Sequence, residues 1–102
     1  MIEPIANLSD GPLPPNAFAW AGRMHEGLRP QSWRLVDALW NARNRAASLD
    51  QLARPVFELA DPPERHQYAP AASRANAFFR INALPFVIRS KNYHLQLISR
   101  PD

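Results

Sequence analysis

The sequence contains no cysteine, only three glycines among its 102 residues, and no long uninterrupted hydrophobic run. The absence of cysteine excludes disulfide bonds, thiolate catalysis and zinc sites with thiolate ligands, and it fits a reducing, cytoplasmic location. The scarcity of glycine argues against a glycine-rich phosphate loop. Because no apolar run approaches about 18 residues, and no basic segment leads into an apolar stretch, we expect neither a membrane span nor a signal peptide.

The residues that are present indicate a folded body. Hydrophobic side chains make up 46% of the sequence and aromatic side chains 10%. Burial of this much apolar surface offsets the conformational entropy lost on folding, whereas disordered chains lack it. A chain of this length has room for one domain with one core.

Positive charge is concentrated in the last third of the chain. The first 64 residues carry six arginines against eight carboxylates, whereas the stretch from Arg65 to Pro101 carries six basic side chains and no carboxylate. These six are Arg65, Arg74, Arg80, Arg89, Lys91 and Arg100. An uncompensated positive field suits a polyanion, because binding to duplex DNA releases counterions. The first hypothesis is therefore a small nucleic-acid-binding domain.

The N-terminal part of the chain is predicted to be an arm followed by a short β-element. Residues 1–16 contain four prolines and no periodicity, which predicts a disordered Pro-rich arm ahead of a domain over 17–99. From Phe18 to Met24, apolar residues alternate with small or polar ones. This alternation predicts a half-buried strand that turns near Gly22-Arg23.

Two helices are predicted next. Pro30 suits a first helical position, and Trp33 and Trp40 share an apolar face, which predicts a helix from about Pro30 to Arg43 with both indoles in the core. Ser48 to Gln51 is a capping-box pattern that starts a second helix. That helix should be short or kinked near Arg54, because a following proline breaks it.

The proline-rich stretch Asp61 to Pro70 is predicted to be a long loop. A third helix is expected from about Ala71 to Ala83, with one face toward the core. The core face carries Ala75, Phe78, Phe79 and Asn82, with Ile81 flanking it. The opposite face carries Ser73, Asn76, Ala77 and Arg80, with Arg74 at its edge. After Pro85, alternating residues predict a β-hairpin over 86–98 with a basic tip at Ser90-Lys91-Asn92.

In this order of elements the chain resembles the winged helix-turn-helix domains, most of all the DNA-binding effector domain of response regulators. The resemblance covers residues 17–99 and rests on element order and apolar spacing. Its parts are Gly22 with Leu28-Arg29-Pro30, Trp33 to Trp40, Leu52 to Phe57, Ala72 to Leu84, and Phe86 to Leu97. The fold expected is α+β, with three helices, a short N-terminal β-element and a C-terminal hairpin wing.

The resemblance implies a DNA-binding transcriptional regulator, with helix 71–83 in the major groove of double-stranded DNA and hairpin 86–98 as a wing. It also implies that loop 60–70 contacts a regulatory protein or RNA polymerase, and that the domain can bind repeated half-sites as a homodimer. We expect Ser73, Asn76, Ala77 and Arg80 to face bases or groove walls, Arg74, Arg89, Lys91 and Asn92 to contact phosphates, and Tyr93 to lie near the wing. The sequence departs from the family in lacking a dense basic row on helix 71–83 and a glycine-aromatic pair in the wing.

Catalytic and metal-binding patterns are not found in the sequence. His25, His66 and His94 are far apart, and neither a His-x-x-x-His pair nor a Gly-x-Ser-x-Gly turn occurs. We therefore expect no enzymatic activity, no metal and no cofactor. The alternative to DNA binding is a winged helix that binds a protein partner, since one fold serves many functions. This alternative is supported by the small number of basic residues on helix 71–83 and by the Pro-rich segments. It is also supported by three aromatic residues that are candidates for exposure: Phe18, Tyr68 and Phe78.

Overall fold

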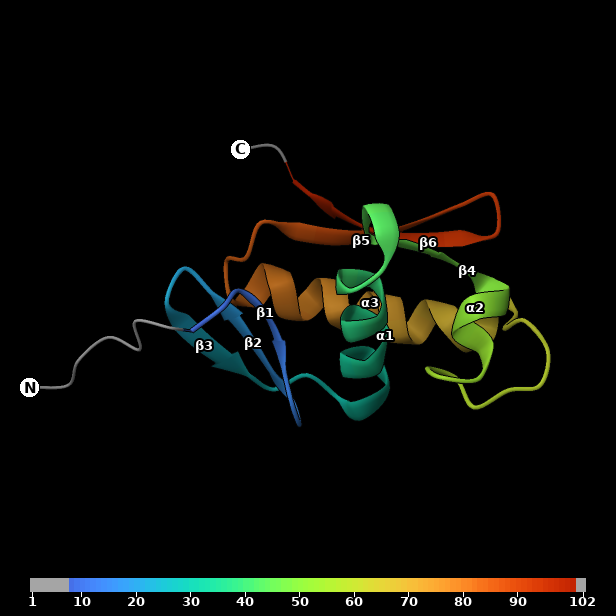
Figure 1. Ribbon diagram of the computed structural model, residues 1–102, viewed down its shortest axis with the longest axis horizontal. Helices are drawn as coiled ribbons and strands as arrows, with labels where there is room; N and C mark the ends of the chain where they lie inside the picture. The colour runs from blue at the N-terminus through green and yellow to red at the C-terminus, as the bar shows by residue number, and fades with distance from the viewer. Residues whose placement is uncertain (1–7, 101–102) are drawn as a thin grey trace, which may run out of the picture.

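The computed structural model describes residues 8–100 and has an α+β fold with three helices and two small antiparallel sheets (Figure 1). The N-terminal strands are β1 Gly11–Leu13, β2 Ala17–Trp20 and β3 Arg23–Glu26. The helices are α1 Pro30–Trp40, α2 Leu49–Ala53 and α3 Arg65–Ile81, and a 3₁₀ turn covers Arg43–Arg45. The remaining strands are β4 Ala46–Ser48, β5 Phe86–Lys91 and β6 His94–Ser99.

Each sheet has three strands. The N-terminal sheet has the order β1-β2-β3, and the second sheet has the order β4-β6-β5. The predicted hairpin over 86–98 is confirmed as β5 and β6, with Phe86 opposite Ser99. β4 was not predicted: it lies between α1 and α2 and pairs with β6 through Ala46 opposite Gln96. The second sheet therefore joins the middle of the chain to its C-terminal hairpin.

The N-terminal segment contributes to the fold more than its prolines suggested. Residues 1–7 of the predicted arm lie outside the described residues, but Gly11–Leu13 pairs with β2, so the expected arm is wrong over these residues. Gly11 lies against the Trp40 indole, where an added Cβ would come within 2.6 Å of Nε1. Met24, predicted on the buried side of its strand, is 52% exposed.

Helix α1 begins at Pro30 as predicted but ends at Trp40 rather than Arg43. Asn41 closes it, with the side-chain amide donating to the Asp37 carbonyl at 2.8 Å. The Trp33 indole Nε1 donates to the carbonyl oxygens of Leu13 and Ala17, at 3.0 and 3.1 Å. Trp33 thereby ties α1 to the turn between β1 and β2.

The start of α2 agrees with the sequence pattern. Ser48 Oγ accepts from the Gln51 backbone N–H at 3.1 Å, and Gln51 Oε1 accepts from the Ser48 N–H at 2.9 Å. The helix ends at Ala53, two residues before Pro55. The prediction of a capping box followed by a short helix is confirmed.

Helix α3 begins at Arg65, six residues earlier than predicted, so the loop assigned to 61–70 is wrong from Arg65 onward. Glu64 and Gln67 form a second capping box, in which Gln67 Oε1 accepts from the Glu64 N–H at 2.8 Å. Pro70 lies inside the helix, in its second turn, and is exposed. It removes one backbone donor there. The helix ends at Ile81, two residues before Ala83.

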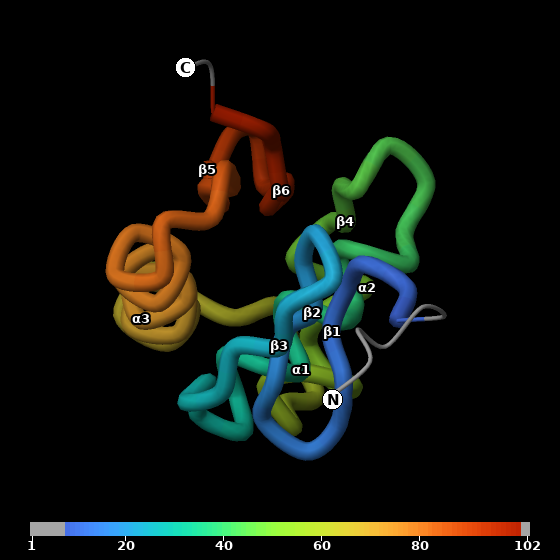
Figure 2. The backbone as a smooth tube through the Cα atoms, turned by 90° about the vertical axis from the view of Figure 1, so that its left-hand side faces the viewer, coloured from blue at the N-terminus to red at the C-terminus, as the bar shows by residue number. Residues whose placement is uncertain are grey.

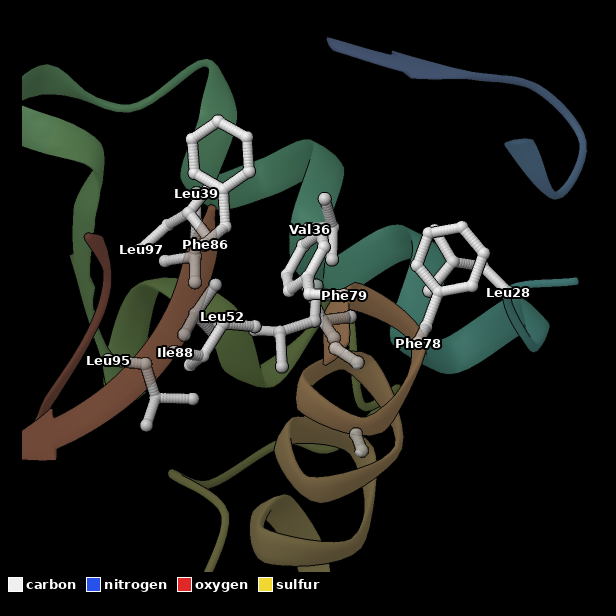
Figure 3. Packing of buried hydrophobic residues seen from close by; sticks show 14 of the residues in the cluster. Leu28, Val36, Leu39, Leu52, Phe78, Phe79, Phe86, Ile88, Leu95 and Leu97 are labelled. Atoms are coloured by element: carbon white, nitrogen blue, oxygen red, sulfur yellow. The ribbon is translucent and has the colours of Figure 1, made fainter. Parts of the chain in front are cut away.

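The core fills the space between α1, α3 and the two sheets (Figure 3). Phe18 is fully buried and makes edge-to-face contacts with Trp40, Phe79 and Phe86 at centroid distances of 5.3, 5.5 and 5.6 Å. The buried Ser32 hydroxyl donates to the Ala71 carbonyl at 2.9 Å, which fixes α1 against α3.

Several sequence-based expectations about exposure are corrected by this core. Phe18 and Phe78, proposed as exposed aromatic candidates, are buried. Ile81, expected beside the core face of α3, is 79% exposed. The helix pattern correctly predicted that Ala75, Phe78 and Phe79 are buried, but it wrongly placed Ile81 beside them.

Candidate nucleic-acid interface

The C-terminal hairpin lies along one side of α3 (Figures 1 and 2). After the helix ends, β5 runs back beside it, so that the hairpin tip reaches the N-terminal end of α3. The hydroxyl groups of Tyr68 on α3 and Ser90 on β5 are 3.4 Å apart near this end. The helix and the hairpin therefore present one continuous surface.

Asn76 joins α3 to β5. Its Oδ1 accepts from the Ile88 backbone N–H at 2.7 Å, and its Nδ2 donates to the Ile88 carbonyl at 3.0 Å. β5 is an edge strand, so these backbone groups have no strand partner on this side. Asn76 was predicted to face bases; that prediction is wrong, because both ends of its amide serve the hairpin.

A groove of about 600 Å³ lies between α3 and the hairpin. Its lining combines small polar and apolar side chains, and α3 contributes both arginines, Arg65 and Arg80. Among the described residues that line it there is no carboxylate. The lining consists of Arg65, Tyr68, Ala69, Ala72, Ser73, Asn76, Ala77, Arg80, Ile88, Ser90 and Leu95. Such a lining suits an anionic ligand, because guanidinium groups bind oxyanions with two parallel hydrogen bonds.

Arg65 is the residue of this groove that the sequence reasoning missed. It was assigned to the loop before the helix because prolines surround it. The signal that could have placed it is the pair Glu64 and Gln67, which has capping-box spacing. A helix beginning at Arg65 brings this arginine onto the same element as Arg80.

The other α3 residues that were predicted to contact DNA lie on the solvent-facing side of the helix. Ser73, Arg74 and Arg80 are exposed and Ala77 is half-buried. At 3.6 residues per turn, Arg74 and Arg80 are about 120° apart around the helix axis, on either side of Ser73 and Ala77. This face has small residues at its centre and one guanidinium on each flank.

The predicted hairpin cations lie on a different side of the sheet. Side chains alternate along a strand, and Ile88 and Ser90 face α3, so Arg89 and Lys91 project from the other face. They line a separate shallow hollow together with His94 and Gln96 of β6. Arg89 and Lys91 therefore do not share a face with Arg80, contrary to the expectation of a single phosphate-binding surface.

The hairpin turn consists of Asn92 and Tyr93, one position later than predicted. Both residues have positive φ, 51° and 61°, and they connect the paired residues Lys91 and His94. This is the geometry of a two-residue type I′ turn, which favours Asn-Gly. The Tyr93 carbonyl accepts from the Leu49 N–H at 2.8 Å. Tyr93 itself is 84% exposed.

Replacing Tyr93 with glycine is expected to stabilise the domain by about 1 kcal/mol, because a residue with a Cβ in the left-handed region costs about that much. Urea unfolding of the variant measures the change. Tyr93→Ala serves as the control, since it removes the aromatic ring but keeps the strained backbone, and it should stay within about 0.5 kcal/mol of the parent. A loss of stability in both Tyr93→Gly and Tyr93→Ala would show that the ring itself stabilises the turn.

No histidine of the described chain belongs to a metal-binding cluster. Within residues 8–100, no three His, Asp or Glu side chains gather in an arrangement that could hold a metal ion. His66 lies 3.4 Å from Glu64 at the start of α3, and His94 Nδ1 lies 2.8 Å from the Asn92 carbonyl. Over the same residues, no helix has both the length and the apolar character that crossing a bilayer requires.

Comparison with protein-family models, with curated proteins and with solved structures finds no match to this chain. The geometry and chemistry of the surface formed by α3 and the hairpin are therefore the basis of its proposed function.

Proposed function

We propose that this chain is a winged helix-turn-helix domain that binds double-stranded DNA and regulates transcription. The observation that carries the proposal is the groove beside α3, in which Arg65 and Arg80 stand without a carboxylate among the described lining residues. α3 enters the major groove with Ser73 and Ala77 toward the bases, and the hairpin tip at Tyr93 contacts the adjacent backbone.

The arrangement of the elements supports this proposal. A short strand, β4, precedes α2 and pairs with the C-terminal hairpin, so α2, α3 and the hairpin are held together as one unit. The N-terminal sheet and α1 lie on the far side of the core and serve as scaffold (Figure 2). The surface of α3 away from α1 is left open to a ligand.

The dimensions of α3 suit a duplex. A helix of 17 residues is about 25 Å long, and the major groove is about 12 Å wide, so the helix ends project beyond the groove. Arg65 and Arg80 lie about 22 Å apart along the axis, at 1.5 Å per residue. Positions near the helix ends are therefore placed over phosphates, while small residues in the middle allow close approach to base edges.

The salt dependence of duplex binding tests the proposal. If Arg65, Arg74 and Arg80 each neutralise one phosphate, log affinity falls against log salt with a slope of about −2.7. The double variant Arg65→Gln/Arg80→Gln should retain a slope of only about −0.9. Fluorescence anisotropy with a random-sequence duplex, repeated over a series of salt concentrations, measures both slopes.

Arg54→Gln is the matched control for this titration. Arg54 is exposed and lies at the end of α2, outside the groove. Its removal lowers the net charge without removing a proposed phosphate contact, so the slope should stay near that of the parent. A change of slope in the control half as large as that in the double variant would mean that only net charge matters, and an affinity independent of salt would exclude DNA binding.

A protein-binding winged helix is the second candidate, favoured by one observation. Ile81 is 79% exposed beside a hollow of about 370 Å³ whose lining includes Leu28 and Phe78. An exposed aliphatic side chain at such a hollow suits a protein partner or a second copy of the chain. Absence of duplex binding, together with concentration-dependent dimerisation that Ile81→Glu abolishes, would favour this candidate over the first.

A further inference from the structure

The outer face of the second sheet is a separate basic surface. The inner face of β5 and β6 contributes the buried residues Phe86, Ile88, Leu95 and Leu97 to the core. The 3₁₀ turn meets the outer face at Gln96, whose side chain donates to the Asn44 carbonyl at 3.2 Å, and beside this contact the face forms an open hollow of about 640 Å³. The lining residues of this hollow are Ala46, Arg89, Ser90, Lys91, Asn92, His94, Gln96 and Ile98.

The cations of this face have no anionic partner among the described residues. Arg89 and Lys91 are exposed, and neither forms an ion pair with a described carboxylate. Lys91 stands opposite His94, and Arg89 stands opposite Gln96, so the cross-strand neighbours supply no negative charge either. Two cations two residues apart on one strand face repel each other weakly, and a bound anion would relieve that repulsion.

One straight duplex cannot easily contact this face and α3 together. Arg89 and Lys91 project from the side of β5 opposite to Ile88 and Ser90, which face α3. The whole domain measures only 50 × 28 × 24 Å. DNA has a persistence length of about 150 base pairs, so it does not fold around a single hairpin without a substantial bending cost.

We infer that the outer face of the sheet formed by β4, β6 and β5 binds the phosphate backbone of a second duplex, so that one copy of this chain bridges two DNA segments. The inference rests on the proposed function, because α3 must hold the first duplex. The second contact is to the backbone alone: two cations and one histidine side chain offer phosphate contacts, and this face has no helix that enters a groove. The second duplex is therefore bound without sequence preference.

A two-duplex capture assay with the full chain tests this inference. One duplex is fixed to beads, a second duplex carries a fluorophore, and the protein is added from substoichiometric amounts to excess. The parent protein is expected to recruit the fluorescent duplex at low protein and to lose it in excess, when each duplex has its own protein. Capture of the second duplex should fall less steeply with salt than binding of the first, because fewer phosphates are neutralised on that side.

The variant Arg89→Gln/Lys91→Gln separates the two surfaces. It should reduce capture of the second duplex about tenfold while the affinity for a single duplex stays within about twofold of the parent. Arg65→Gln/Arg80→Gln should weaken both measurements, and Arg54→Gln should change neither. Sedimentation of the free protein at the assay concentration shows whether a dimer, rather than two surfaces of one copy, links the duplexes.

The outcomes distinguish this inference from the proposed function. Binding of one duplex without capture of a second overturns bridging and leaves α3 as the DNA-binding element, whereas no duplex binding at all overturns both. Bridging is also overturned if capture survives in Arg89→Gln/Lys91→Gln or follows the dimer fraction in sedimentation. A loss of single-duplex affinity in that variant equal to the loss in Arg65→Gln/Arg80→Gln overturns it as well, because one duplex would then contact both surfaces.

Discussion

Replacing Phe18 with alanine is expected to destabilise the domain by about 4 kcal/mol, a large fraction of the total stability of a small domain. Phe18 is fully buried and is the residue at which β2 meets Trp40 of α1, Phe79 of α3 and Phe86 of β5. The cost combines the lost transfer free energy, the cavity left behind and three edge-to-face contacts. Urea unfolding followed by tryptophan fluorescence and circular dichroism measures it.

Met24→Ala is the control for this substitution because Met24 belongs to the same sheet but is 52% exposed. Its free energy of unfolding should change by less than about 0.5 kcal/mol. Phe18→Leu should fall between the two, since it keeps much of the volume but removes the ring contacts. Similar unfolding free energies for Phe18→Ala and Met24→Ala would mean that the aromatic cluster does not hold the two sheets together.

Asn76→Ala is expected to cost about 3 kcal/mol of unfolding free energy, the second largest effect. The substitution removes two hydrogen bonds and leaves the N–H and the carbonyl of Ile88 without partners in a partly buried position. Asn76→Asp should also destabilise the domain, because a carboxylate can accept from the N–H but repels the carbonyl. Urea unfolding gives the cost, and loss of hydrogen-exchange protection at Ile88 locates it.

Ser73→Ala is the matched control for Asn76, one turn away on the same helix and exposed. It should leave the stability within about 0.5 kcal/mol of the parent. The two substitutions also distinguish a role in stability from a role in DNA recognition, since Ser73 is a proposed base-facing residue and Asn76 is not. An Asn76→Ala protein that keeps its stability but loses its preferred DNA sequence would restore Asn76 as a base-reading residue.

Much of the fold could be predicted from local signals. Pro30 and the Ser48-Gln51 box mark helix starts, and alternation marks the C-terminal hairpin. β1 and β4 could not be found this way, because strands of three residues are too short to show periodicity and depend on partners elsewhere in the chain. The early start of α3 was hidden by Pro70, whose cost the Glu64-Gln67 box helps to offset.

The candidate site was less predictable than the fold. The helix pattern distinguishes core-facing from outward-facing residues, and it placed Ser73, Arg74 and Arg80 on the exposed side. It cannot show that one outward-facing flank packs against a hairpin, and for this reason Asn76 was misassigned. The separation of Arg89 and Lys91 from α3 follows from which face of β5 is docked, a tertiary property that a strand pattern leaves open.

The pairing of β4 with β6 also determines the order in which the domain can fold. The Gln96 side chain donates to the Asn44 carbonyl across 52 residues, and β4 gains its only strand partner in the described chain from the same hairpin. Local hairpins close within microseconds, whereas a contact over such a distance must first offset the entropy of a long loop. We therefore expect β5 and β6 to form before β4 joins them, so the sheet whose outer face we propose to hold a second duplex is completed late in folding.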